Sequence, residues 1–205
     1  LVSGYSLSHL LVMIAFMLPP ALVAMFSQPY RVKRVFSFLF PALDPTGMSY
    51  QVSTSLQAIR TGGLFGLGLG KGTFKLGLLP EVQSDFIFAS VCEEIGFVGS
   101  SFFILLFVLF GVLGYLGAQR ILEKNRFLSL GAFGLTSMVL FQAVLNLMVV
   151  TALLPPTGIP LPFFSQGGTN LFVALVGCSF IYRVLRINAG TVVIKHQEDS
   201  SWRYS

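Results

Sequence analysis

The chain has 205 residues, of which 54% are hydrophobic and only 10% charged, and its mean hydropathy is +0.80. Such a composition is too apolar for a soluble domain and predicts an all-α integral membrane protein. The net charge of +5 is too small and scattered to indicate a nucleic-acid partner, and two histidines and two cysteines leave almost no material for a zinc site or a Ser-His-Asp triad.

A bilayer core about 30 Å thick needs about 20 apolar residues per helix. Four stretches meet this requirement: 8–26, 97–118, 127–154 and 171–185. The second can begin as early as Asp85, which is too long for a simple span and predicts a tilt or a break near Gly96–Gly99. We therefore expect a polytopic transmembrane helix bundle over 1–187, with about four spans, a long external loop at 27–84 and a mobile cytoplasmic tail at 188–205. Because Leu1 directly precedes an apolar run without a cleavage site, we expect a fragment whose N-terminal part is missing.

Basic residues predict the orientation. The short loop before residue 127 contains Arg120, Lys124 and Arg126, and Arg183 and Arg186 lie at the end of the last span. The positive-inside rule places that end in the cytoplasm, so loops 27–84 and 155–168 share the external face. The prolines of 155–168 predict a re-entrant or external loop that lines a polar cavity or is buried in protein. External cations predict an anionic partner: Arg31, Lys33, Arg34, Arg60, Lys71 and Lys75.

The glycine run from Gly62 to Gly77 does not fit a nucleotide-binding loop, because Gly72 separates Lys71 from Thr73. We expect these glycines to permit tight turns and close backbone approaches.

Among the acids, Asp85 has two interpretations that the residues leave open: a helix N-cap or first-turn acid, or a general base. On a helix, Glu93 lies about 12 Å further along the axis, too far to form a catalytic acid pair with Asp85. We therefore predict that Glu93 and Glu94 make structural hydrogen bonds or ion pairs. Ser165 is not expected to be a nucleophile, since no histidine is placed to activate it.

Several motifs together resemble the SEDS family (shape, elongation, division, sporulation). They are Leu79-Pro80-Glu81, Ser84–Ala89, Glu93–Gly99, Thr157–Phe163, Ser165 and Gly167-Gly168. A second group favours the FtsW-like division branch over the RodA-like elongation branch: Pro29-Tyr30-Arg31, Asp44-Pro45, Tyr50-Gln51 and Gly66–Gly70. Members of this family have about ten transmembrane helices, so the chain resembles a C-terminal portion. It departs from the usual pattern at Val82-Gln83-Ser84, Gln166 and Thr169-Asn170.

This resemblance implies a peptidoglycan glycosyltransferase that polymerises lipid II during cell division, on the outer face of the bacterial plasma membrane. It implies a class B penicillin-binding transpeptidase and other division proteins as partners, membrane lipids as surroundings, and no activity of the fragment alone. The essential acid of the family falls on Asp85. Substrate-binding candidates are Arg31, Lys33, Arg34, Lys71, Lys75, Glu81, Ser165 and Gln166. No protein metal site is expected, although a divalent cation could share the charge of the diphosphate. The alternatives are a transporter (flippase) of lipid-linked precursors and a non-catalytic division scaffold.

Overall fold

The computed structural model describes residues 7–40, 48–74, 85–165 and 168–188. Throughout these ranges the regular structure is helical: α1 (Leu7–Phe26), α2 (Pro29–Leu39), α3 (Met48–Gly62), α4 (Ile87–Ile121), α5 (Arg126–Val150) and α6 (Gly168–Asn188). The all-α prediction is confirmed.

Three of these helices, α4, α5 and α6, are long and apolar enough to cross a membrane; an 18-residue window in each has a mean hydropathy of 2.5, 1.9 and 1.5, respectively. The chain is therefore a polytopic membrane protein. The first predicted span coincides with α1, whose apolar stretch Leu11–Pro20 is shorter, so a fourth span stays a prediction. Compared with the predicted spans, α5 ends earlier, at Val150, and α6 extends further at both ends.

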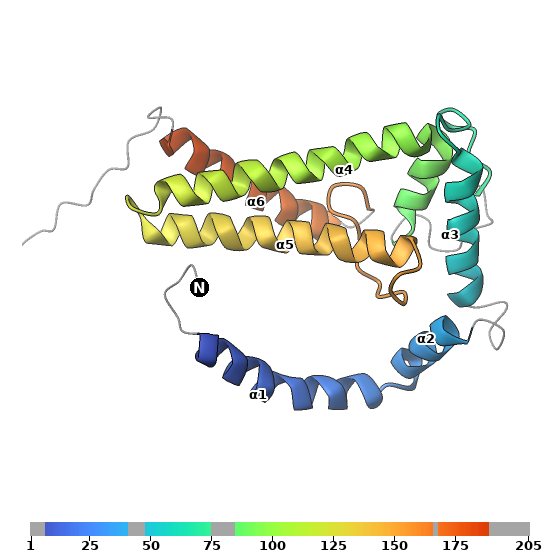
Figure 1. Cartoon of the computed structure of the whole chain (residues 1–205), viewed down its shortest axis with the longest axis horizontal. Coiled ribbons are helices and arrows are strands. Elements are labelled where there is room, and N and C mark those ends of the chain that lie inside the picture. The colour runs from blue at the N-terminus through green and yellow to red at the C-terminus, as the bar shows by residue number, and fades with distance from the viewer. Residues whose placement is uncertain (1–6, 41–47, 75–84, 166–167, 189–205) are drawn as a thin grey trace, which may run out of the picture.

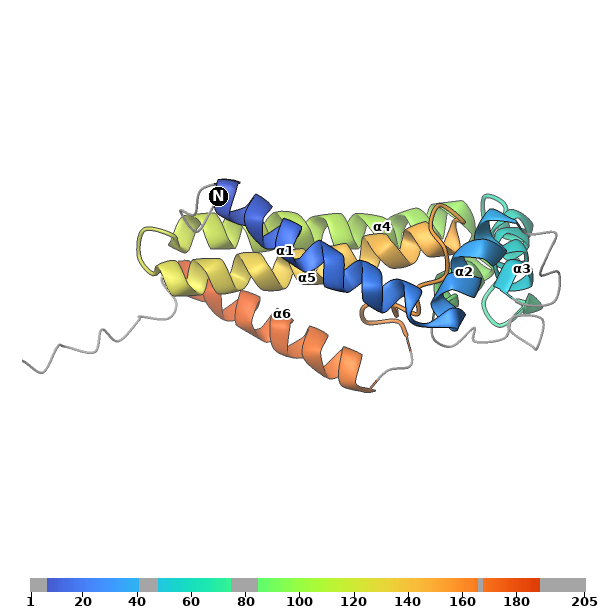
Figure 2. The ribbon, with the colours of Figure 1, turned by 90° about the horizontal axis from the view of Figure 1, so that it is seen from below.

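The three long helices pack closely at the end that holds the α4–α5 turn (Figures 1 and 2). Glycines of α4 make this possible: a Cβ on Gly114 would collide with Thr136 of α5, and one on Gly117 would lie 2.9 Å from Leu185 of α6. Asn188 Nδ2 closes the contact by donating to Gly117 O at 2.8 Å. The bundle is thereby held together at the end opposite to Asp85.

The connection 27–84, which we predict to be a long loop, contains helices α2 and α3. Pro29 starts α2 because its fixed φ and missing N–H suit the first turn. Helix α3 buries Thr54, Ser55 and Ala58, and Ser55 Oγ donates to Val150 O of α5 at 3.0 Å. Both helices are short and partly polar, so a search for 20-residue apolar runs does not find them.

Helix α4 is broken at Gly96, whose φ of 71° and ψ of −171° are not helical. The break falls in the predicted range, and Figure 1 shows the first segment, which ends at Ile95, turned steeply away from the rest of α4. In a continuous helix the N–H groups of Phe97 and Val98 would donate to Glu93 O and Glu94 O. The break separates these four groups.

The glycine run restores the hydrogen bonds that the break removes. Leu67 N and Gly68 N donate to Glu93 O and Glu94 O, both at 3.0 Å. On the other side of the break, the carbonyls of Gly63 and Leu64 accept from Phe97 N at 2.9 Å and Val98 N at 3.1 Å. We call residues 63–74 the glycine clasp, because it holds both sides of the broken helix.

Glycine is needed at the centre of this contact. A Cβ on Gly66 would collide with Glu94 O, and a Cβ on Gly96 would collide with Gly66 N. Gly66 also has a φ of 78°, which L side chains rarely adopt. The predicted role of these glycines in turns and close approaches is confirmed for the described part of the run, and Gly77 lies outside it.

A fully buried carboxylate, that of Glu93, anchors the end of the clasp. Its Oε1 accepts from Thr73 N at 2.7 Å and from Thr73 Oγ1 at 3.1 Å, and its Oε2 accepts from Phe74 N at 3.3 Å. A carboxylate with several donors is a stable way to bury a charge. The structural role predicted for Glu93 is confirmed.

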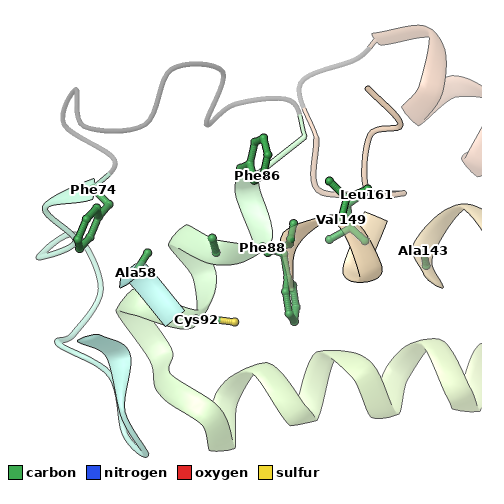
Figure 3. Close-up of a cluster of buried hydrophobic side chains, with 10 residues drawn as sticks. Ala58, Phe74, Phe86, Phe88, Cys92, Ala143, Val149 and Leu161 are labelled. Atoms are coloured by element: carbon green, nitrogen blue, oxygen red, sulfur yellow. The ribbon is translucent and has the colours of Figure 1, made fainter. Parts of the chain in front are cut away.

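A hydrophobic core surrounds the first segment of α4 (Figure 3). Phe86 is 1% exposed and packs in one cluster with Phe74 of the clasp and with Val149 of α5. Leu161 of the loop that follows α5 is fully buried in the same cluster. The core therefore joins the clasp, the start of α4 and that loop into one unit around Asp85.

Candidate functional site

Asp85 lies immediately outside α4. The N-cap is Phe86, which makes no side-chain capping bond, and the first turn of the helix contains no acid. Of the two interpretations of Asp85, the capping one is therefore wrong. The local reason is packing: Phe86 is drawn into the core, so the helix begins after it and leaves the half-buried Asp85 before the first turn.

The main chain of Asp85 is held by a buried amide on another helix. Asn146 of α5 is 1% exposed, and its Nδ2 donates to Asp85 O and to Ile159 O, each at 2.8 Å. Asp85 and the loop after α5 are thus tied to the same side chain.

Side-chain atoms of Arg34 and Asp85 both approach Gly158 of that loop. Gly158 has a φ of 76°, and a Cβ placed there would lie 3.6 Å from Arg34 Nη1 and 3.7 Å from Asp85 Oδ2. Arg34 Nη1 also donates to Pro156 O at 3.2 Å, which docks α2 on the loop. A carboxylate that can take a proton and a guanidinium that can bind a phosphate are therefore neighbours.

The loop 155–165 turns back into the bundle. Gln142 of α5 donates from Nε2 to Pro160 O at 3.0 Å, although it lies two turns before the end of α5. The aromatic rings of Phe163 and Phe164 reach α4, where Phe164 packs edge-on against Phe103 with centroids 5.0 Å apart. The described part of the loop is thus irregular and partly buried against α4 and α5, and its position relative to the membrane stays a prediction.

Ser165 closes this loop. It is 8% exposed, and its Oγ accepts from Leu161 N at 2.7 Å. This hydrogen bond gives Ser165 a structural role, and its part in substrate binding stays a prediction.

A cavity of about 290 Å³ opens next to Pro156. It is lined by α2, α3 and the loop after α5: Ser37, Phe38, Ser49, Val52, Ser53, Leu56, Ala152 and Pro156. Because Arg34 binds the carbonyl of Pro156, this mostly apolar space lies beside the cationic part of the site.

The other predicted substrate-binding residues are not gathered around Asp85. Lys33 is exposed on α2. Lys71 belongs to the glycine clasp, which contacts α4 at Glu93 and Glu94, more than two turns from Asp85. The Arg31 side chain and all of Lys75, Glu81 and Gln166 lie outside what the structure describes. Across the described residues, no cluster of three or more His, Cys, Asp or Glu side chains is placed to hold a metal ion.

Sequence reasoning missed Asn146 and Gln142. Both are amides in an otherwise apolar span, spaced i, i+4, and therefore on one face of α5. A polar pair of this kind inside a membrane helix indicates a buried contact. That signal would have been sufficient to select them as candidates.

Residues 1–189 match the family model for FtsW, RodA and SpoVE, described as "Cell cycle protein". One similar curated protein is the "Probable peptidoglycan glycosyltransferase FtsW" of Borreliella burgdorferi, which is 43% identical over 89% of this chain and 50% of its own length. Another is the "Stage V sporulation protein E" of Bacillus subtilis, 44% identical over 78% of this chain and 43% of its own length.

A solved structure is also similar. It is reported under the words "Structural coordination of polymerization and crosslinking by a peptidoglycan synthase complex", and one of its chains matches with a TM-score of 0.62 and 29% identity, over 90% of this chain and 51% of that chain. The present chain thus spans about half the length of the relatives that it matches. The match over residues 1–189 and the two curated relatives confirm the resemblance seen in the sequence: the chain belongs to the FtsW/RodA/SpoVE (SEDS) family of cell cycle proteins.

Proposed function

We propose that this chain is part of a peptidoglycan glycosyltransferase that polymerises lipid II during cell division, and that Asp85 is its general base. The observation that carries the proposal is the approach of Asp85 Oδ2 and Arg34 Nη1 to the same point above Gly158. The printed names of the similar FtsW proteins support the reaction class. The FtsW proteins that carry these names are about twice as long as this chain.

The chemistry joins two lipid-linked disaccharides. A sugar hydroxyl of one attacks the anomeric carbon of the other, and the bond from that carbon to the polyprenyl diphosphate breaks, with its electron pair leaving on the diphosphate. The carboxylate of Asp85 takes the proton of the attacking hydroxyl, a role typically worth about 10² to 10⁴ in rate. Arg34 stabilises the negative charge of the departing diphosphate.

The surroundings of the site suit such a substrate. The cavity lined mostly by apolar side chains next to Pro156 offers room beside Arg34, and the membrane-spanning helices offer apolar surface to a lipid tail.

We place the site on the extracytoplasmic face of the bacterial plasma membrane. The α4–α5 turn and the C-terminal end of α6 lie together, away from the start of α4 (Figure 1). Basic residues gather at that end, which supports a cytoplasmic location for it. A class B penicillin-binding transpeptidase is the expected partner, in line with the peptidoglycan synthase complex named for the similar structure.

The test uses the full-length protein with its transpeptidase partner in liposomes that contain labelled lipid II. The proposal predicts glycan polymer from the wild-type protein and a rate at least about 10²-fold lower from Asp85→Asn. Movement of the headgroup across the bilayer without polymer would favour a transporter instead, and unchanged polymer and cell division with Asp85→Asn would favour a scaffold.

A further inference from the structure

We propose that Asn146 is a positioning residue that holds Asp85 in its reactive place; this inference rests on the proposed function of Asp85. Asn146 touches no reacting atom in this arrangement. It acts through the main chain, because both hydrogens of its amide are given to carbonyl oxygens, one of Asp85 and one of Ile159.

The amide can adopt only one orientation. Asn146 Oδ1 is buried and accepts no hydrogen bond from the described residues, whereas Nδ2 faces two acceptors at 2.8 Å. A rotation that exchanged oxygen and nitrogen would place an acceptor against two acceptors and lose both bonds. The two carbonyls therefore hold the side chain fixed, and the side chain in turn fixes the distance between them.

This single link joins the two sides of the site. Asp85 O belongs to the residue that carries the base, and Ile159 follows Gly158, the glycine that Arg34 and Asp85 both approach. Asp85 precedes the N-cap of α4, so its main chain lies outside the helix and Asn146 links it to α5. Asn146 thus ties the main chain of the residue that carries the base to the loop that Arg34 also binds.

Helix α5 also provides a matched control for this role. Gln142, one turn earlier on the same face, donates to Pro160 O at 3.0 Å and to Asn170 Oδ1 at 2.8 Å. It holds the same loop and the start of α6 but has no bond to Asp85. Substitution of Gln142 therefore reports the effect of weaker loop anchoring, whereas substitution of Asn146 also reports the loss of the bond to Asp85.

The experiment measures polymerisation of labelled lipid II by the full-length protein with its partner, for Asn146→Leu and Gln142→Leu. Leucine keeps the approximate size of each side chain and removes its donors. We expect Asn146→Leu to lower kcat by about 10- to 100-fold with KM within about threefold, because a displacement near 1 Å of a reacting group costs rate rather than affinity. For Gln142→Leu we expect kcat within about threefold of the wild type.

The double variant with Asp85→Asn shows whether the effect passes through the base. If Asn146 acts through Asp85, adding Asn146→Leu to Asp85→Asn lowers the residual rate no further, and lipid II binding is retained in both single variants. The proposal would be overturned if the double variant lost rate by the product of the two single losses. It would also be overturned if Gln142→Leu lost as much kcat as Asn146→Leu, or if Asn146→Leu had the kcat of the wild type.

Two further measurements keep these outcomes distinct. If Asn146→Leu does not fold, Asn146→Ala serves instead, since the smaller side chain leaves room for a water to bridge the carbonyls of Asp85 and Ile159. We expect kcat of Asn146→Ala to be lower than that of the wild type, but by less than about tenfold. A kcat equal to that of the wild type would contradict the proposal. If Asp85→Asn alone polymerises at the wild-type rate, the proposed function itself fails. A normal Asn146→Leu beside an inactive Asp85→Asn overturns only the positioning role.

Discussion

Arg34 and Asp85 approach the same glycine, Gly158, from two different elements: α2 carries the guanidinium, and the residue before the N-cap of α4 carries the carboxylate. Gly158 itself belongs to a third element, the loop after α5, to which Arg34 is tied through Pro156 O. The acid and the cation are thus assembled by tertiary structure and not by a local motif.

Replacement of the Arg34 side chain removes the bond to Pro156 O and the cation that we propose binds the diphosphate. For Arg34→Gln in the full-length protein we expect kcat/KM for lipid II to fall by about 10- to 100-fold, since a charge-assisted hydrogen bond to a charged group is worth about 1.5–3 kcal/mol. Lys33→Gln is the control, because it removes the same charge from the exposed residue that precedes Arg34 on α2. It should lower kcat/KM by less than about threefold. Equal losses would show that only the net charge of α2 matters.

Substitution at the break of α4 tests the glycine clasp. Gly96→Ala should lower the thermal unfolding temperature in detergent, because a Cβ would collide with Gly66 N and because this backbone conformation is essentially restricted to glycine, at a cost of about 1–3 kcal/mol. Gly134→Ala on α5 is the comparison, since nothing lies within 4 Å of its added Cβ. A Gly96→Ala protein as stable as Gly134→Ala would mean that the clasp does not form.

The neutral substitution Glu93→Gln tests whether the buried carboxylate of Glu93 stabilises the fold. Glu93→Gln replaces a carboxylate that accepts from Thr73 N, Thr73 Oγ1 and Phe74 N by a group with one acceptor oxygen. We expect a loss of about 1–3 kcal/mol in the free energy of unfolding. Glu123→Gln, at an exposed acid in the α4–α5 turn, should change it by less than about 0.5 kcal/mol.

Thiol labelling in intact cells tests the proposed orientation. Cysteine at the exposed position 33 should react with a membrane-impermeant maleimide, whereas cysteine at the exposed position 124 should react only after permeabilisation. The unsubstituted protein reports the background from Cys92 and Cys178. The reverse pattern would invert the bundle and place Asp85 on the cytoplasmic face.

Much of the fold could be predicted from the sequence, because the bilayer demands long apolar runs and these are visible in α4, α5 and α6. The break in α4 was also predictable, since 35 residues exceed a simple span and Gly96 is available. Helices α2 and α3 were not found, because their stability comes from packing against neighbours rather than from a long apolar pattern.

The site was predicted in part. Asp85 and Arg34 were both candidates, but composition gave no way to rank Arg34 above Lys33 or Lys71. Their ranking depends on where α2 docks, and the bonds of Arg34 to Pro156 O and of Ser49 to Ser37 O contribute to that position. The interpretation of Asp85 as a cap failed for a similar reason: the burial of Phe86 moves the helix start by one residue, which local propensity does not reveal.

The central claim is that Asp85 acts as the base. The most direct measurement compares Asp85→Asn with Glu123→Gln in the full-length protein with its partner, recording both the rate of glycan polymerisation and the binding of labelled lipid II. We predict that Asp85→Asn binds lipid II within about threefold of the wild type and loses at least about 10²-fold in rate, while Glu123→Gln keeps both. Polymerisation by Asp85→Asn at the rate of Glu123→Gln would contradict the account.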